Sequence, residues 1–382
     1  MVQHRSPVAN ENIKGYRMKN KNLIITLLTA IISCSTFSCK DTGTGPNQKP
    51  FKDPRQMTWS IDTLEYPGSM QTIMESMWAS SPSDVWITGH NDRSHGDLWY
   101  YNGTKWNEID VFKDVESSAK SFNKISGFSS SNIWAVGTRD FNDPLNPSDR
   151  WFKDLIIQYN GTKWIEHKQN SGSRIIGLHC NTPNDIWVGG SNGFIANYDG
   201  AIWKKDTLKI KIASGYPYFI KSIAKFNGKV FLLVSSDAPY FEKYYFVQGE
   251  MKNWTLVDSI YYDGTNFHIK WGYWGLYVSP FEKLYSYGPG GIWEWQNGWI
   301  NILKLNFPIR GMYGISSDYI FAAGDYGYVY FYDGTSWIQL TRFAETPSYL
   351  VYTDAWTNGY ETFILGHTVN GWPQKTVIWR GK

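Results

Sequence analysis

The chain has 382 residues, of which 17% are aromatic and 19% are charged, and it contains 35 glycines. This composition excludes a disordered chain, because disordered segments are poor in aromatic residues. It favours an all-β protein with many turns over a helical one. The formal net charge of +3 is too small for the basic surface that nucleic-acid binding requires.

The segment 1–38 has the pattern of an export signal. Lys19 and Lys21 precede the apolar run 23–32, and small residues with two cysteines follow. The run is too short to span a bilayer, but it has the length of a signal-peptide core. We therefore expect residues 1–38 to be removed after export, with translation starting at Met18. Their removal takes away five basic residues and one acidic residue, so the formal charge falls from +3 to −1.

The end of this segment resembles the lipobox of bacterial lipoproteins, in which signal peptidase cuts before a lipid-carrying cysteine. Cys34 fits the usual pattern of that motif somewhat better, but a polar, turn-rich stretch begins directly after Cys39. We therefore expect lipidation at Cys39, with Cys34 as the alternative and residues 39–55 as a flexible tether. The resemblance implies a protein anchored to the bacterial cell envelope, at the outer membrane and facing the periplasm or the surface. An ordinary secretory signal with an incidental cysteine remains the other interpretation.

A repeating unit occupies residues 56–382, and its clearest copy is 126–164. Asn160-Gly161 separates two apolar runs there, which predicts a hairpin turn with positive φ at both central residues. A tryptophan closes each copy and recurs about every 46 residues, the length of a four-stranded propeller blade. These tryptophans are Trp59, Trp106, Trp164, Trp203, Trp254, Trp299 and Trp337.

An earlier strand of each unit begins with Asp or Asn and then an aromatic residue, as in Asp84-Val85-Trp86 and Asn132-Ile133-Trp134. We expect the Asp or Asn side chain to bond the backbone of the preceding turn. The aromatic ring should pack between neighbouring sheets.

The last unit ends at Lys382 without a closing tryptophan strand, whereas 57–62 near the N-terminus looks like the closing strand 105–110. The N-terminal strand is therefore expected to complete the C-terminal blade, which removes the open edge between first and last blades. The sequence predicts an all-β, seven-bladed β-propeller of four-stranded blades over residues 56–382, closed in this way.

These motifs resemble those of bacterial cell-envelope propellers with an Asp-Ile-Trp-x-x-Gly and Tyr-Asp-Gly-x-x-Trp repeat, and more distantly those of kelch propellers. The resemblance covers residues 56–382 and rests on structural positions such as Asp185-Ile186-Trp187 and Tyr198-Asp199-Gly200. It implies a fold and an envelope location, while the functions of such propellers vary.

Extra length falls on loops that follow the second and fourth strands, which gather on one face of a propeller. The longest insertions are 138–154 and 260–274. Long loops on a rigid scaffold are where binding usually occurs, and Tyr, Trp and Arg dominate protein interfaces. Packing between blades is the alternative role for each of these rings. The candidate ligand-binding residues are Arg93, His95, Arg139, Asp140, Trp151, Tyr240, Tyr261, His268, Trp271 and Trp372.

The function favoured by these patterns is a non-enzymatic binding or scaffold propeller for a protein or glycan partner. The alternative is a glycan-active hydrolase or lyase at the channel mouth, using carboxylates such as Glu75, Asp140 and Asp325. No nucleophile motif or phosphate loop is present, so we assign no catalytic residue and no cofactor. We expect a monomer without a metal site, since His90 and His95 lack an evident third ligand. Cleavage before Cys39 leaves Cys180 as the one free thiol, so we expect no disulfide.

Overall fold

The computed structural model describes residues 50–93, 95–115, 119–142, 150–211, 216–238, 242–344 and 349–382. Within it, Phe51–Lys382 form one compact unit. Cys34, Cys39 and Tyr240 lie outside the described residues. None of the described helices has the length and apolar sequence that crossing a membrane takes.

Seven antiparallel sheets of four strands make up this unit, which confirms the predicted β-propeller. The first blade consists of β2 (Thr72–Ser81), β3 (Asp84–Asn91), β4 (Leu98–Tyr101) and β5 (Trp106–Glu108). The second consists of β6 (Ala119–Ser129), β7 (Asn132–Asn142), β8 (Arg150–Tyr159) and β9 (Trp164–Glu166). The third consists of β10 (Ile175–Thr182), β11 (Asp185–Gly190), β12 (Phe194–Tyr198) and β13 (Trp203–Thr207).

The remaining blades follow in chain order. The fourth consists of β14 (Tyr218–Phe226), β15 (Lys229–Ser236), β16 (Glu242–Glu250) and β17 (Asn253–Tyr261). The fifth consists of β18 (Gly275–Val278), β19 (Leu284–Gly288), β20 (Gly291–Trp295) and β21 (Trp299–Lys304). The sixth consists of β22 (Ile309–Ser316), β23 (Tyr319–Gly324), β24 (Val329–Tyr332) and β25 (Trp337–Gln339). The seventh consists of β26 (Leu350–Thr357), β27 (Thr362–Thr368), β28 (Thr376–Gly381) and the N-terminal β1 (Trp59–Leu64).

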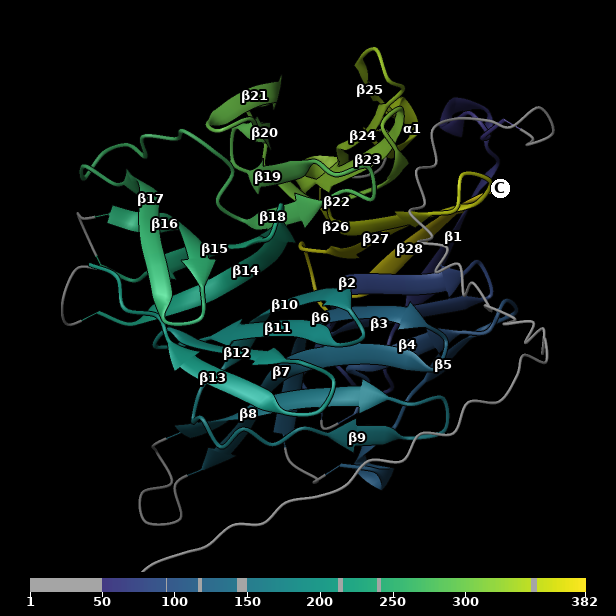
Figure 1. The fold of residues 1–382 in the computed structure, drawn as a ribbon. Coiled ribbons are helices and arrows are strands. Elements are labelled where there is room, and N and C mark those ends of the chain that lie inside the picture. The colour runs from purple at the N-terminus through teal and green to yellow at the C-terminus, as the bar shows by residue number, and fades with distance from the viewer. Residues whose placement is uncertain are drawn as a thin grey trace, which may run out of the picture. The chain divides into compact units, whose positions relative to one another are not determined.

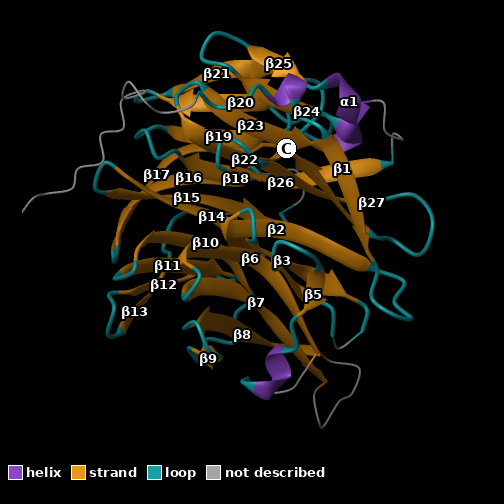
Figure 2. Cartoon of the chain, turned by 90° about the vertical axis from the view of Figure 1, so that its right-hand side faces the viewer, coloured by secondary structure: helices purple, strands orange, loops and turns teal. Residues whose placement is uncertain are grey.

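The first strand of each blade lies innermost and contacts the first strand of the next blade, around to β26 and β2 (Figure 1). Strands dominate the unit, as Figure 2 shows. The described helices are one short α-helix, α1 (Thr341–Ala344), and three 3₁₀ turns at Pro54–Gln56, Val111–Lys113 and Asp325–Gly327.

The ring is closed by the N-terminal strand, as the sequence predicts. β1 pairs with β28 from Trp59 opposite Gly381 to Leu64 opposite Thr376. The Trp59 ring packs edge-on against Phe343 at 4.9 Å. The closing blade therefore has its fourth strand, and no edge of β28 is left unpaired.

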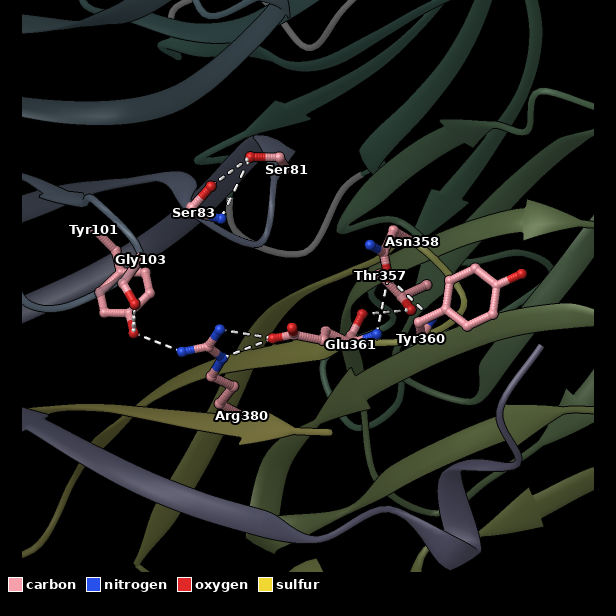
Figure 3. A network of polar contacts seen from close by, with 9 residues as sticks. All are labelled: Ser81, Ser83, Tyr101, Gly103, Thr357, Asn358, Tyr360, Glu361 and Arg380. Atoms are coloured by element: carbon pink, nitrogen blue, oxygen red, sulfur yellow. Dashed lines mark hydrogen bonds and ion pairs between the residues drawn. The ribbon is translucent and has the colours of Figure 1, made fainter. Parts of the chain in front are cut away.

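A polar network joins the closing blade to the first blade (Figure 3). The Arg380 guanidinium donates to Glu361 Oε2 at 2.9 Å from Nε and to the Tyr101 hydroxyl at 2.5 Å from Nη1. Arg380 also lies over the Tyr101 ring, 5.2 Å from its centroid. Residues from the two ends of the propeller sequence are thus tied together by a charged group with little exposed surface.

The tryptophans of the second strands are buried between blades, as expected, and Trp134 is fully buried. The Asp or Asn two residues earlier has a different role from the one we predicted. Asn132 accepts the indole N–H of Trp134 at 3.0 Å, and Asp185 accepts that of Trp187 at 2.7 Å. The acidic or amide side chain therefore satisfies a buried donor, which would otherwise cost free energy.

The turns that close the blades also differ from the prediction. In Asn160-Gly161 the glycine has a φ of +93°, but Asn160 has no positive φ. The ladder resumes only at Tyr159 opposite Trp164, so the turn has four residues rather than two. Asn160 Oδ1 accepts the backbone N–H groups of Thr162 and Lys163 at 3.0 Å each, which fixes this longer turn.

Candidate functional site

Two faces can be distinguished on the propeller. Because neighbouring strands are antiparallel, the connections after the second and fourth strands of every blade leave at the same end, which we call the loop face. It includes the described loops 65–71, 262–274, 305–308, 325–328 and 369–375. The connections after the first and third strands form the opposite end, which we call the turn face.

Exposed aromatic side chains of the described residues gather on the loop face. There they are Tyr216, Tyr261, Phe267, Tyr326, Tyr349 and Trp372. On the turn face, Phe51 and Tyr360 are exposed and pack against each other with ring centroids 6.1 Å apart. Large aromatic groups left in contact with water on one face mark that face as a candidate binding surface.

Two of the predicted residues reach the surface at the end of β17 and in the loop 262–274 that follows it. The Tyr261 ring stacks on His268 at 4.3 Å, and both side chains are exposed. His268 Nε2 lies 2.9 Å from Asp263 Oδ2. This pairing fixes the imidazole orientation, so that the stacked rings form a firm part of the loop face.

Trp271 does not belong to that surface. It is fully buried, donates its indole N–H to Asp258 at 3.1 Å and packs beside Phe246. A ring without exposed surface cannot contact a partner, so the structure does not support Trp271 as a ligand-binding residue. Trp271 fills the space between the fourth and fifth blades.

Arg139 is also buried, with 2% of its side chain exposed. Its Nη2 lies 2.9 Å from Glu166 Oε2, an ion pair within the second blade. A partner on the loop face has no access to this guanidinium, so we remove Arg139 from the candidate site. The next residue, Asp140, is half-buried and sits opposite Ala119 in the ladder of β6 and β7.

The insertion 138–154 extends β7 and β8 as a longer hairpin. Trp151 is opposite Phe141 in that ladder, and the Trp151 side chain lies outside the described part. Tyr240, in the connection after β15, lies outside it entirely. For both residues, a role in binding stays a prediction.

Arg93 and His95 hold loops of the first blade in place. The Arg93 guanidinium donates to the Gly68 carbonyl, at 2.8 Å from Nε. His95 packs on Phe112 at 4.8 Å and lies 3.7 Å from Asp110. The described residues contain no group of three side chains that could hold a metal ion.

Trp372 is the most exposed large aromatic residue of the described chain, with 62% of its surface accessible. It lies in the loop between β27 and β28 on the loop face. Nearby, the backbone N–H of Val369 donates to the Tyr349 carbonyl at 2.8 Å, and both of these side chains are exposed. These three residues form an apolar area of the seventh blade.

The sixth blade adds an aromatic group that the sequence analysis did not single out. Phe307 stacks on Tyr328 at 4.8 Å and touches Tyr326 at 5.0 Å. Tyr326 has a φ of +57° and is 53% exposed. A positive φ is uncommon for a tyrosine, so the backbone here holds the ring outward at some cost.

A bulge that recurs in the first strands carries three charged residues, Glu75, Lys221 and Arg310. Six first strands have one extra residue at the same place, and these bulged residues are Glu75, Asn123, Ile176, Lys221, Arg310 and Thr353. Lys221 in the fourth blade interacts electrostatically with Arg310 in the sixth blade and with Glu75 in the first. Electrostatic contact between blades that are not neighbours places these groups around the central channel.

Arg310 is the most tightly held of them. Its guanidinium forms a two-pronged ion pair with the Asp325 carboxylate, in which Nη2 lies 3.2 Å from Oδ2. It also lies over the Trp274 ring, 4.5 Å from the centroid. Such a fixed fork, stacked on an indole, is suited to planar polar groups of a ligand.

His367 lies beside this cluster and is buried. Burial lowers the pKa of His367 to about 4, with the charges of Glu75, Arg310 and Asp325 acting on it as well. The imidazole is therefore neutral near pH 7 and offers a hydrogen bond without a charge.

Next to the bulged residues, Lys124 of the second blade and Asp354 of the seventh interact electrostatically. Burial raises the pKa of Asp354 to about 6, although Lys124 and the backbone N–H groups of Met77 and Ala355 oppose the change. Both of those N–H groups donate to the carboxylate at 2.9 Å. Asp354 thus links the seventh blade to the first and supplies a partly protonated group near pH 6.

Sequence reasoning named Glu75 and Asp325 but missed Lys221, Arg310 and His367. The sequence signal that could have revealed Lys221 and Arg310 is an alignment of the first strands that includes their extra residue. Placing that residue in register shows which side chain of each blade occupies the bulge. Single-residue bulges leave almost no trace in a hydrophobic pattern, so spacing alone did not reveal the set.

Together these features define a seven-bladed β-propeller with an aromatic loop face and a charged channel mouth. Solved structures of the same class resemble it. YCF48 bound to a D1 peptide matches 85% of this chain and 96% of its own, with 13% identity and a TM-score of 0.55. YCF48 from Cyanidioschyzon merolae matches 84% of this chain and 98% of its own, with 13% identity and a TM-score of 0.54.

A third similar structure is the extracellular domain of the putative hybrid two component system BT3049 from B. thetaiotaomicron. It is 14% identical with a TM-score of 0.52, over 83% of this chain and 40% of that chain. At these identities the likeness shows the fold alone. No family model matches the sequence, and no curated protein matches it.

Proposed function

We propose that the protein is a non-enzymatic propeller that binds a protein partner on its loop face. The gathering of exposed aromatic side chains on that face, around a mouth with fixed charges, carries the proposal. Exposed Tyr and Trp on a rigid frame lose little conformational entropy on binding and bury much surface. The structurally similar YCF48 has been solved with a D1 peptide, which is consistent with a propeller of this class binding a polypeptide.

The expected partner segment is an extended polypeptide with apolar and charged side chains. Its apolar groups would contact Tyr326, Trp372 and the Tyr261–His268 stack. Its charged groups would reach Lys221 and Glu75, for which no ion pair within the described chain is present. Charge at the mouth then sets the register and the association rate, while the rings supply most of the affinity.

The experiment selects binders from a displayed library of random peptides on the purified full-length protein. Selected peptides are then measured against Tyr326→Ala and Trp372→Ala. The matched control is Tyr360→Ala, which removes an exposed ring from the turn face. Loss of roughly 1–2 kcal/mol in each loop-face variant but not in the control supports the proposal. Equal affinity for all of these variants would place the site elsewhere.

A glycan partner is tested in the same series. A glycan array probed with wild type and the Trp372→Ala variant tests this alternative, because an exposed indole can also cover the C–H face of a sugar ring. Binding to sugars that is lost in the variant, without any selected peptide, would replace the protein partner by a glycan.

The alternative of a glycan-active hydrolase requires two carboxyl groups, one of them kept protonated near neutral pH. Among the described carboxyl groups, Asp354 has a raised pKa, and backbone N–H groups already occupy it. At the mouth, Asp325 is engaged by Arg310. These engagements favour binding over hydrolysis, and hydrolytic activity lost in both Glu75→Gln and Asp354→Asn would reverse that preference.

Export and lipid anchoring complete the proposal. They are supported by the apolar run, the cysteines and the polar stretch near the N-terminus. The double variant Cys34→Ala/Cys39→Ala should lose labelling by radioactive palmitate and leave the membrane fraction. Single variants then assign the lipid to one cysteine, and labelling that persists in the double variant contradicts the anchor.

A further inference from the structure

A cavity of about 530 Å³ lies between the fifth and sixth blades. Lys283, Ser317 and the pair Thr335–Ser336 place one side of it beside turns of the turn face. Its lining also includes the side chains of Tyr285, Glu294, Ile302, Lys304, Tyr332 and Trp337. The volume lies in the range of small-molecule sites.

The indole N–H of Trp337 is left without an acceptor at this junction. At other junctions the closing tryptophan donates to the residue three positions after the preceding blade's tryptophan. These pairs are Trp106 with Asp62 at 3.1 Å, Trp203 with His167 at 3.3 Å and Trp254 with Asp206 at 3.0 Å. In the fifth blade that position is Ile302, which cannot accept a hydrogen bond.

Trp164 and Trp299 lack an acceptor too, but their nitrogens are sealed inside the protein. Trp337 differs because it lines the cavity, and its N–H is not among the sealed donors of the described chain. A donor of a lining residue that is not sealed inside the protein is available to a ligand.

Tyr285 provides a second unused polar group. The residue is 2% exposed and lines the cavity, and no described residue bonds its hydroxyl. Burial raises the pKa of Tyr285, with the neighbouring Glu294 adding to the effect, so the hydroxyl stays protonated. The Tyr285 oxygen is not among the sealed side-chain atoms of the described chain, so a ligand in the cavity can reach this hydroxyl.

The charge of the cavity is positive. Lys283 Nζ lies 2.9 Å from Glu294 Oε2, and Gln296 donates to the other oxygen at 2.8 Å. Glu294 is therefore neutralised, whereas Lys304 has no ion pair among the described residues. One cationic group remains to attract an anion.

The anion that fits is a carboxylate rather than a phosphate. Phosphate sites usually offer several free backbone N–H groups. Here the backbone N–H groups of Thr335 and Ser336 both donate to Asp333 at 2.9 Å, so that turn has none to spare. What remains is a set of side-chain hydroxyls, two donors from aromatic residues and a lysine.

We propose that this cavity binds an acidic saccharide unit, such as a uronic acid. Lys304 would pair with the sugar carboxylate, while the Tyr285 hydroxyl and the Trp337 N–H bond ring hydroxyls. The side chains of Tyr332 and Trp337, 5.2 Å apart, provide apolar surface for the C–H face of the ring. The cavity shares no residue with the set proposed to contact the loop-face partner.

Calorimetry on the full-length protein tests the proposal with digalacturonate as the probe. Methyl glucoside is the neutral comparison, and inorganic phosphate is the anionic one. We expect digalacturonate to bind at least about tenfold more tightly than either, since a charged hydrogen bond contributes about this much. No heat with digalacturonate at millimolar concentration, or equal binding of methyl glucoside or phosphate, overturns the acidic-saccharide assignment.

Two conservative variants locate the binding. Tyr285→Phe removes one hydroxyl and keeps the ring, and Lys304→Gln removes one charge. Each should weaken digalacturonate binding by about tenfold with an unchanged Tm. Lys204→Gln is the matched control, because Lys204 pairs with Asp199 in the third blade at 3.0 Å. Wild-type affinity in both cavity variants, or an equal loss in the control, contradicts the site.

Discussion

One turn motif recurs in the molecule, and two of its copies have different results. In the second blade, Asn160 Oδ1 accepts the N–H of Thr162 and its hydroxyl, and the Tyr159 hydroxyl donates to the Gly161 carbonyl. In loop 262–274, Asp263 Oδ1 accepts the N–H of Thr265 and its hydroxyl. There the Tyr262 hydroxyl donates to the Gly264 carbonyl in the same way.

The two copies differ in the aromatic residue that follows. Trp164 closes the blade copy and is 3% exposed, packed beside Trp86 between two blades. Phe267 closes the loop copy and is 36% exposed on the loop face. Local hydrogen bonds therefore specify the turn wherever the motif stands, whereas the surrounding sheets decide whether its ring serves the core or the surface.

The largest effect should come from removing the strand that completes the ring of blades. Deletion of 57–64 takes away β1, leaves β28 with an open edge and removes the Trp59 ring from Phe343. We expect a loss of at least about 3–5 kcal/mol, or roughly 10 °C in Tm. Calorimetric melting measures it. If the deletion variant has the same Tm as the full chain, closure by β1 does not stabilise the blades or the turn copies within them.

The next comparison removes the two rings. Trp164→Ala should cost about 3–5 kcal/mol of unfolding free energy, because it leaves a cavity between blades. Phe267→Ala should cost about 1 kcal/mol or less, since the ring is partly solvated. Urea unfolding of both variants gives the two values. Equal losses would show that Phe267 belongs to the core.

A smaller effect should follow from the two glycines. Gly161 has a φ of +93° and Gly264 a φ of +98°, so alanine is strained at either place by about 1 kcal/mol. At Gly161 the added Cβ would also meet Ser131 Cβ at 2.8 Å. Gly161→Ala should therefore lower Tm more than Gly264→Ala does. The reverse order would mean that the loop copy is the more tightly packed of the two.

The smallest expected effect is a change in loop 262–274 at acidic pH. Hydrogen bonds from Thr265 and Asn266 hold the pKa of Asp263 below its ordinary value of 3.8, whereas Asn160 does not titrate. A carboxyl with a lowered pKa stabilises the folded turn above pH 3.8, and that contribution is lost as the pH falls further. NMR signals of loop 262–274 should change below about pH 4, and those of Asn160 should not. Asp263→Asn should remove the difference between the two copies.

The architecture was largely predictable because the repeat tryptophans and the orphan strand 57–62 carry it. The spacing of these tryptophans predicted the number of blades. The absence of a closing strand in the last unit predicted closure by the N-terminal strand. The turn type was predicted wrongly, since Asn-Gly alone does not reveal that Asn160 also bonds Thr162 and Lys163. A dipeptide fixes the place of a turn better than its length.

The candidate site was less predictable. Trp271 and Arg139 were expected at the surface because they stand in insertions, but an inserted segment can fold back and fill space between blades. Their partners, Asp258 and Glu166, lie on fourth strands, and the spacing of the repeat does not reveal that these carboxylates bond Trp271 and Arg139. By contrast, Tyr261, His268 and Trp372 do lie exposed on the loop face, where short-range aromatic stacking and turn chemistry hold them.

The position of β1 also has a mechanical consequence. Because Trp59 pairs with Gly381 at the start of an antiparallel strand, a pull on the N-terminal segment would unzip β1 from β28 one pair at a time. Before that load reaches Trp59, it acts on two hydrogen bonds of Lys52. The Lys52 backbone N–H donates to the Gly359 carbonyl at 2.8 Å, and the Tyr319 hydroxyl donates to the Lys52 carbonyl at 2.7 Å. Tension on this end must therefore first detach residues 51–53 from two different blades, so these contacts protect the pairing of β1 with β28.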